Sequence, residues 1–328
     1  MGSYLLGIDL GGTKISAAVF DEGNNIIARA RAKTRAKRDE ENVFETIVKT
    51  GKEAVASAGL GPKDLLALGI GSPGPIDPDT GYIVDSVNIR FKNFPLGPRL
   101  SEEFGCPASV NNDVSAGTYG EFKAGAARGA SHVLGIFVGT GIGGGLILNG
   151  SLYQGFSKNA GEVGHIIIKA GGPRCGCGNR GCLEALASRT AMTRRIKKAI
   201  RSGHKTLIRK LVDKKADVIP SSVLKEAYDA GDRVVMKVVN QAAHHIGVGI
   251  GSLVNLLGPE VVVLGGGVIH ALGEEMMETI ETITREVTFE ITAKDLRITR
   301  AELGDDAGVT GAALLARESL RLVTSDAK

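Results

Sequence analysis

The sequence contains two copies of one short pattern about half a chain apart, and this internal repeat constrains the fold more than any other feature. Residues 6–13 read LGIDLGGT, and residues 134–141 read LGIFVGTG. In each copy an apolar strand runs into a glycine-rich turn, and a second strand follows, at residues 15–20 and 145–148. The repeat predicts an α/β fold with two similar domains that face each other across a cleft. Ligands favour such clefts.

The composition is that of a globular protein with room for two hydrophobic cores. The chain has 328 residues, of which 43% are hydrophobic and 23% charged. No apolar run approaches the roughly 20 residues that span a bilayer, and the N-terminus lacks the basic segment of a signal peptide. The net charge of +4 is too small to favour nucleic acid. We therefore expect no membrane or nucleic-acid partners. Cysteines reserved for a metal rather than for disulfides, as described below, favour the cytoplasm.

The residue pattern also predicts helices, each bounded by turn-forming or charged residues. They are expected over residues 43–58, 183–200, 232–257, 271–286 and 312–322.

Four potential metal ligands lie in the segment from residue 161 to residue 184. His165, Cys175, Cys177 and Cys182 match the ligand set of a closed, tetrahedral Cys₃His zinc site. The alternative is three reduced thiols and an ordinary core histidine. However, buried structural cysteines normally have apolar surroundings, whereas these lie among glycines and arginines. Zinc would also supply folding free energy to a loop with few apolar side chains.

Two glycine-rich turns are candidates for phosphate binding, because successive backbone N–H groups form an anion-binding nest. The first, residues 9–14 (DLGGTK), adds a hydroxyl and an ammonium group, whereas the second, residues 140–145 (TGIGGG), has no cation. Glycine in a tight hairpin can be purely steric, but two such turns fit a polyphosphate gripped from both sides. Neither matches a P-loop or a dinucleotide fingerprint.

Two features beside these turns leave alternatives open. Asp9 could hold Mg²⁺ through water, or it could only bond its own turn backbone. Gly265–Gly267 ends an apolar strand. It could leave room for a flat base, or it could be a plain strand-to-helix turn.

Asp113 follows two asparagines at the end of a predicted strand. It could cap the next helix, or it could be a general base that takes a proton from an attacking hydroxyl. Asn112, Glu162 and Glu184 suit hydrogen bonding to the vicinal hydroxyls of a sugar. One nitrogen of His165 could bind zinc while the other bonds that sugar.

With these motifs the chain resembles the ROK family of sugar kinases and repressors within the hexokinase–actin superfamily, and in particular its ATP-dependent glucokinases. The resemblance runs from Gly7 to Ala316. Its motifs are GIDLGGTK (7–14), GSPGPID (71–77), NND (111–113), GTGIGGG (139–145), GEVGH (161–165), CGCGNRGCLE (175–184), PEVVVLGGG (259–267) and GDDAGVTGAA (304–313).

The resemblance implies two actin-like, ribonuclease H-like domains around a cleft, with a structural zinc loop at 161–184. The small domain would be residues 1–115, completed by about 312–328, and the large one residues 116–311. The implied reaction transfers the γ-phosphate of ATP to the 6-hydroxyl of glucose, with Asp113 as the base and Mg²⁺ as a cofactor. A homodimer or homotetramer is implied as well.

The resemblance also assigns individual residues. The implied sugar ligands are Ser72, Gly74, Asn88, Asn112, Asp113, Glu162, His165 and Glu184. The implied ATP ligands are Asp9, Gly11, Gly12, Thr13, Lys14, Thr140, Gly141 and Gly143 at the phosphates, and Gly265, Gly266 and Gly267 at the adenosine. The implied zinc ligands are His165, Cys175, Cys177 and Cys182.

Several alternatives remain within this resemblance. Many family glucokinases have Gly-Trp after the equivalent of Asn88, whereas this chain continues with Ile89-Arg90 and has no tryptophan. N-acetylmannosamine, fructose, mannose and allose are therefore alternative sugars. A sugar-sensing regulator without catalysis would carry a DNA-binding segment before the first turn, which starts here at residue 9. The basic strip at 29–37 leaves a polyphosphate donor open, and the basic segment 194–215 has no assigned role.

Overall fold

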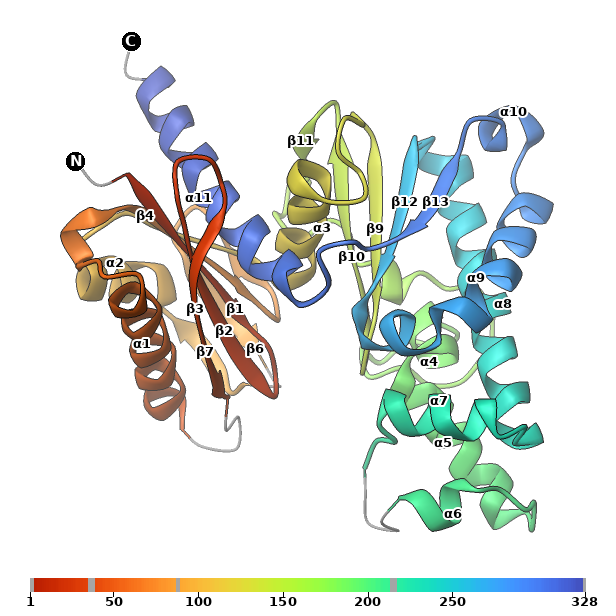
Figure 1. The fold of residues 1–328 in the computed structure, drawn as a ribbon. Helices are drawn as coiled ribbons and strands as arrows, with labels where there is room; N and C mark the ends of the chain where they lie inside the picture. Colours follow the sequence, from red (N-terminus) through yellow and green to blue (C-terminus); the bar gives the residue numbers. More distant parts are fainter. Residues whose placement is uncertain (1–2, 35–38, 87–88, 213–216, 327–328) are drawn as a thin grey trace. The chain divides into compact units, whose positions relative to one another are not determined.

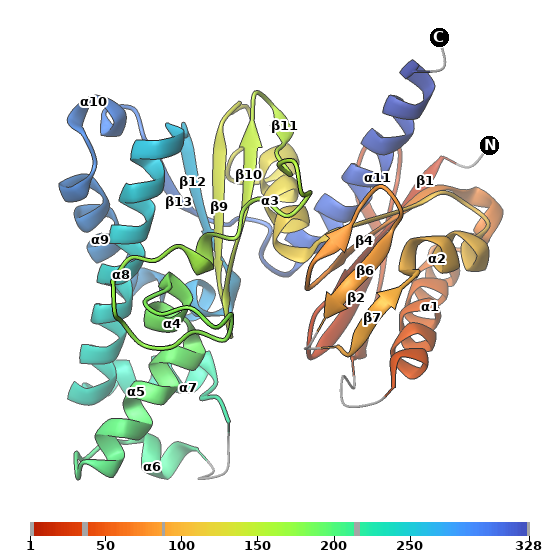
Figure 2. The ribbon, with the colours of Figure 1, turned by 180° about the vertical axis from the view of Figure 1, so that it is seen from behind.

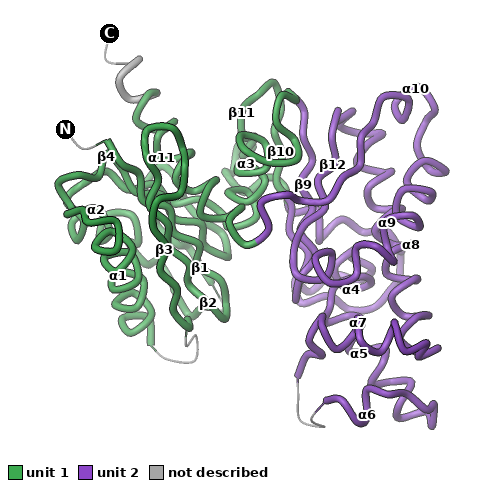
Figure 3. Tube along the Cα trace, in the orientation of Figure 1, with its two compact units in different colours: residues 1–131, 145–161, 305–328 green, residues 132–144, 162–304 purple. Residues whose placement is uncertain are grey.

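Figure 1 shows the fold in a computed structural model, which describes residues 3–34, 39–86, 89–212 and 217–326. Its contacts divide the chain into two compact units, coloured in Figure 3. The first comprises residues 1–131, 145–161 and 305–328, and the second residues 132–144 and 162–304. The domain boundaries expected near residues 115 and 312 stay a prediction.

The first unit is built on a five-stranded sheet with the strand order β3-β2-β1-β4-β8. β1, β4 and β8 are parallel, and β2 and β3 are antiparallel to their neighbours. A small sheet of β5, β6 and β7 adjoins β8 through β5. The elements are β1 (Tyr4–Leu10), β2 (Lys14–Phe20), β3 (Ile26–Lys33), α1 (Glu40–Ser57), η1 (Pro62–Asp64), β4 (Leu65–Ser72), β5 (Ile76–Asp77), β6 (Tyr82–Ser86), β7 (Phe91–Phe94), α2 (Leu96–Phe104), β8 (Ala108–Asn112), α3 (Asp113–Ala124), β11 (Ser151–Leu152), η3 (Gly304–Asp306) and α11 (Ala307–Asp326).

Both faces of this sheet are covered, because side chains alternate along each strand. In β1, Leu6 and Ile8 pack on one face in a core shared with α1 and α2, which lie side by side (Figures 1 and 2). Leu5 points to the other face, where it packs against Val309 and Ala313 of α11. The C-terminal helix therefore completes the core of the N-terminal sheet.

The second sheet has the order β11-β10-β9-β12-β13, which repeats the order of the first. Both copies of the sequence repeat form a strand, a glycine turn and a second strand. The remaining elements are β9 (Val133–Val138), β10 (Ile142–Leu148), η2 (Val163–His165), α4 (Leu183–Ala187), α5 (Arg189–Arg201), α6 (Ile208–Leu211), α7 (Ser221–Asp229), α8 (Arg233–Leu257), β12 (Val261–Gly265), α9 (Gly266–Val287), α10 (Glu290–Ala293) and β13 (Arg297–Arg300). The mixed α/β fold class is confirmed.

Helix boundaries follow the capping chemistry. The side chain of Asp232 accepts hydrogen bonds from the first turn of α8, which ends at the left-handed Gly258, so the helix predicted over 232–257 is confirmed. The single helix predicted over 183–200 is wrong. The chain is extended at Ser188, whose hydroxyl caps α5, so two helices form there. No helix among the described residues is long and apolar enough to cross a membrane.

Candidate functional site

In the first unit, the register of three parallel strands gathers the candidate residues at one edge of the sheet. Asp9 of β1 lies opposite Gly71 of β4, and Ser72 lies opposite Asn112 of β8. Asp113 follows directly as the first residue of α3. The carboxyl ends of parallel strands are the usual ligand-binding edge of such sheets. The structure therefore brings together four sequence-predicted residues, three from separate strands and one from the start of α3.

Asn112, and not Asp113, caps helix α3. The side-chain oxygen of Asn112 accepts hydrogen bonds from the N–H groups of Val114 at 3.0 Å and Ser115 at 3.1 Å. Oδ1 of Asp113 also accepts the N–H group of Val114, at 2.9 Å. The N-cap position belongs to Asn112, and Asp113 is the first residue of the helix. The amide N–H groups of Asn112 are the part of that side chain that suits a sugar hydroxyl.

The carboxyl group of Asp9 is hard to ionise in this setting. Burial raises the pKa of Asp9 to about 7, the negative charge of Asp113 adds to the rise, and Lys14 opposes it. Helix α11 crowds the same carboxyl, since a Cβ atom at Gly308 would stand 2.8 Å from its Cγ atom. A divalent cation would relieve this cost. Asp9 thus fits Mg²⁺ held together with water and phosphate oxygens.

The first glycine turn is closed by its own backbone. The N–H group of Gly11 donates to the carbonyl of Lys14 at 2.9 Å, while Gly12 and Thr13 are exposed. Lys14 is not an isolated cation, because its Nζ lies 2.7 Å from a carboxylate oxygen of Asp305. A phosphate that binds Lys14 would therefore compete with that carboxylate.

The remaining sugar candidates of the first unit lie at the end of β4 or after it. Ser72 is fully buried at the strand end. Gly74 has a φ of +104°, and a Cβ atom there would stand 2.4 Å from the carbonyl oxygen of Asp85, so this tight loop requires glycine. Asn88 lies outside the described residues. Ile89 and Phe91, which follow it, are buried.

In the second unit, Glu184 links the glycine turn to the cysteine cluster. One carboxylate oxygen of Glu184 accepts the N–H group of Ile142 at 3.0 Å, and the other lies 3.7 Å from Sγ of Cys175. A Cβ atom at Gly141 would come within 2.4 Å of the first oxygen. Glu184, expected to bind sugar, therefore also holds the turn in place.

Arg189 is the functional candidate that sequence reasoning missed. Its Nη2 donates to the hydroxyl of Thr140 at 2.6 Å, and its Nη1 lies 3.4 Å from the hydroxyl of Ser221. The basic residues of the segment that begins at Arg194 drew attention instead. The serine at position 188 was the signal available, because serine is a favoured N-cap residue and its hydroxyl caps α5, which begins at Arg189.

The adenosine candidates start α9. Gly265 is the residue before the helix, and Gly266 and Gly267 are its first two residues. Gly266 has a φ of +86°, and a Cβ atom there would stand 2.6 Å from the carbonyl oxygen of Val138. The strand-to-helix turn is therefore real, and its glycines bring it against the end of β9.

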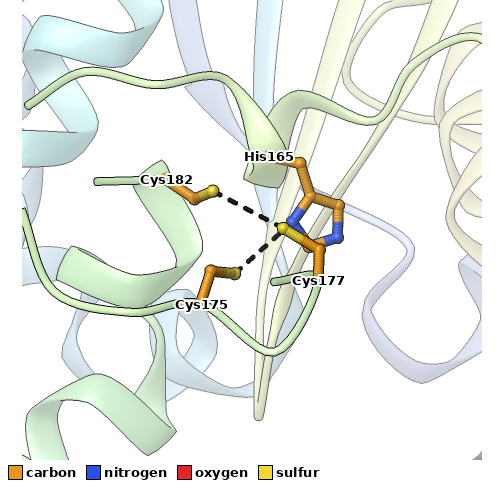
Figure 4. Close-up of side chains that lie close together, drawn as sticks. All are labelled: His165, Cys175, Cys177 and Cys182. Atoms are coloured by element: carbon orange, nitrogen blue, oxygen red, sulfur yellow. Dashed lines mark hydrogen bonds between the residues drawn. The ribbon is translucent and has the colours of Figure 1, made fainter. Parts of the chain in front are cut away.

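His165, Cys175, Cys177 and Cys182 converge, as Figure 4 shows. Their ligand atoms all lie within 4.8 Å of one another, and among the described residues this is the only such group of three or more potential ligands. Sγ of Cys177 lies 3.7 Å from Sγ of Cys182, and Sγ of Cys175 lies 3.6 Å from Nδ1 of His165. Zn–S bonds of 2.3 Å give tetrahedral edges of about 3.8 Å. The residues therefore fit a zinc ion.

The pKa of Cys182 and the surroundings of His165 also fit a zinc ion in this cluster. Burial raises the pKa of the Cys182 thiol to about 12, so a cation is what would favour its thiolate there. The second ring nitrogen of His165, Nε2, lies 3.9 Å from a carboxylate oxygen of Glu162. That separation is too long for a hydrogen bond. Nδ1 can thus face the metal while Nε2 and Glu162 face a ligand hydroxyl.

Comparison with known proteins assigns the chain to a family. The model of the ROK family matches residues 5–319, nearly the whole chain. The chain belongs to the ROK family. The family resemblance drawn from the motifs is confirmed.

Its ROK relatives include both enzymes and regulators. The chain is 34% identical over 316 residues to a glucokinase of Halalkalibacterium halodurans, covering 96% of this chain and 95% of the relative. The crystal structure of a ROK glucokinase from Streptomyces griseus with glucose and AMPPNP is similar, with a TM-score of 0.81, 33% identity and coverage of 96% of this chain and 100% of that one. A xylose repressor of Caldicellulosiruptor bescii is 31% identical, covering 94% of this chain and 76% of the repressor.

Proposed function

We propose that this ROK protein is an ATP-dependent hexose kinase, with glucose as the expected sugar and glucose 6-phosphate and ADP as the products. The similarity to the glucokinase that binds glucose and AMPPNP supports the substrate pair. The observation that carries the proposal is the position of Asp113 at the ligand-binding edge of the sheet. Asp113 follows the N-cap residue Asn112 as the first residue of α3, and its negative charge is close enough to Asp9 to raise the pKa of that buried carboxyl.

In the proposed reaction, Asp113 accepts the proton of the attacking sugar hydroxyl. Phosphoryl transfer depends mainly on positioning and on neutralising charge, so the base adds a limited part of the rate. Asn112, Glu162, His165 and Glu184 would bind the sugar hydroxyls, as would Ser72 and Asn88.

The remaining roles concern the nucleotide and the metals. The two glycine turns would hold the phosphates, and the start of α9 the adenosine. Asp9 would hold Mg²⁺, which when bound to ATP neutralises phosphate charge. The zinc would be structural and would fix the loop that carries His165 and Glu184.

A coupled ADP-release assay over a panel of hexoses tests this function. We expect turnover with glucose and a loss of about 10²–10⁴-fold in kcat for Asp113→Asn, because that is the usual contribution of a general base. Asp229→Asn is the matched control, since Asp229 only pairs with Lys225 on the surface of α7. Equal turnover by the Asp113 variant and the wild type would refute the base assignment. A preference for N-acetylmannosamine, fructose, mannose or allose would correct the sugar and keep the kinase.

A sugar-sensing regulator without catalysis is the second candidate, because the similarity to the xylose repressor covers most of the chain. This candidate would be favoured if calorimetry shows sugar binding but the coupled assay shows no ADP release with any hexose. The resemblance also implies a cytoplasmic homodimer or homotetramer, and light scattering on the purified protein tests the oligomeric part.

A further inference from the structure

The backbone at the start of α5 is joined to the second glycine turn. The N–H group of Arg189 donates to the carbonyl of Gly139 at 3.0 Å, and the hydroxyl of Thr190 donates to the carbonyl of Thr140 at 2.8 Å. This join directs the Arg189 side chain along the turn, where its guanidinium meets the hydroxyls of Thr140 and Ser221. All of these residues belong to the second unit.

The positive charge of Arg189 has no counter-ion among the described residues. Its guanidinium bonds are made to neutral hydroxyls, and it forms no ion pair in the part of the chain that the structure describes. Its Nε is buried and has no hydrogen-bond partner in the part of the chain that the structure describes. Burial lowers the pKa of the guanidinium, and no carboxylate opposes that shift. Arg189 is only half-buried, so a ligand can reach its guanidinium. Because even partial burial of an unpaired cation is unfavourable, this arrangement is suited to an anion.

The position of Arg189 indicates which anion. In the turn that it touches, Thr140 is exposed and Gly141 and Gly143 are half-buried. This turn was expected to bind phosphate without a cation of its own. Ser221 also lies by the start of α9, since a Cβ atom at Gly267 would be 4.0 Å from its hydroxyl oxygen. Arg189 therefore stands between the turn assigned to phosphates and the glycines assigned to adenosine.

We propose that Arg189 binds the phosphate chain of the nucleotide and is the cation of the second glycine turn, as Lys14 is of the first. The inference rests on the proposed kinase function and adds a nucleotide-binding residue to it. The guanidinium suits this role because its planar fork can offer two parallel donors to phosphate oxygens. The rival role is purely structural, in which Arg189 only ties the turn to α5.

Two substitutions separate these roles. Arg189→Gln keeps a donor for the hydroxyl of Thr140 but removes the charge, whereas Arg189→Lys keeps the charge and removes the fork. Arg201→Gln is the matched control, because Arg201 is an exposed arginine at the far end of the same helix. Binding of MgATP and of inorganic tripolyphosphate to the full-length, zinc-loaded proteins is measured by calorimetry.

We expect Arg189→Gln to weaken binding of both ligands about 10- to 100-fold, the usual effect of losing a charge-assisted hydrogen bond. Arg189→Lys should lose less, and Arg201→Gln should bind like the wild type. In the coupled assay the KM for ATP should rise in Arg189→Gln, while glucose binding by calorimetry stays unchanged. A folded Arg189→Gln that binds both ligands like the wild type would overturn the inference.

The binding test is independent of turnover, so it also distinguishes the two proposals. If the wild type binds tripolyphosphate, Arg189→Gln weakens that binding and no hexose is phosphorylated, the kinase proposal fails while the assignment of Arg189 stands. If the wild type binds neither ligand, the Arg189 assignment fails. Should Arg189→Gln not fold, Arg189→Lys decides. If Arg189→Lys binds within about ten-fold of the wild type, the charge of residue 189 binds the phosphates. If Arg189→Lys also fails to fold, the role of Arg189 is structural.

Discussion

Replacing Asp9 with asparagine should stabilise the protein, and it should do so more at pH 8 than at pH 5. Burial beneath the start of α11 and the charge of Asp113 raise the pKa of Asp9 from 3.8 to about 7. Below about pH 4 the carboxyl is protonated in both the folded and the unfolded chain. Between about pH 4 and pH 7 only the folded chain keeps the proton, so the free energy of unfolding falls as the pH rises. Above that window the contribution is constant.

The size of the effect follows from the two pKa values. The full difference between them corresponds to roughly 4 kcal/mol at pH 8, and the part that falls between pH 5 and pH 7 to roughly 3 kcal/mol. Because the side chain keeps some contact with solvent, we expect less. The stabilisation by Asp9→Asn should be about 1–2 kcal/mol larger at pH 8 than at pH 5.

Urea unfolding followed by far-ultraviolet circular dichroism at the two pH values measures this difference. The buffers contain no Mg²⁺ or nucleotide, and no chelator, so that the proposed zinc stays bound. Asp21→Asn is the control, because a hydrogen bond from Asn25 lowers the pKa of that exposed carboxyl. Its effect should be the same at pH 5 and pH 8. If Asp9→Asn has equal effects at the two pH values, Asp9 does not titrate as the structure indicates.

Two further substitutions test the metal cluster and the packing of the first unit. Cys182→Ser should lower the bound zinc from one ion per chain to nearly none, as measured by mass spectrometry, and should lower the melting temperature. Cys106→Ser, which lies outside the cluster, should retain the metal. Unchanged zinc in Cys182→Ser would contradict the site. Gly69→Ala should cost more than about 2 kcal/mol in urea unfolding, because its Cβ atom would stand 1.9 Å from the carbonyl oxygen of Ala312. Gly61→Ala should change little, since its nearest neighbour would be 3.8 Å away, and equal costs would contradict the close approach of β4 and α11.

Much of the fold could be predicted because its signals are local. Each glycine turn is flanked by apolar strands in the sequence itself, and the two copies of this pattern form two sheets with the same strand order. The zinc ligands could also be named in advance, because three thiols within eight positions are rarely accidental in such polar surroundings. The error at residues 183–200 was local too. Both segments have helical composition, and only the extended backbone of Ser188 separates them.

The sequence by itself determined the chemical groups of the candidate site: three thiols and an imidazole, two glycine turns and a carboxylate after two asparagines. Only the tertiary structure decided which partners the charged side chains have. Lys14 pairs with Asp305, and Arg189 reaches Thr140, although neither pair is close in the chain. The pKa of Asp9 likewise depends on a helix from the other end of the sequence. Burial and Coulomb energies depend on distance in space, and the packing of sheets and helices sets those distances.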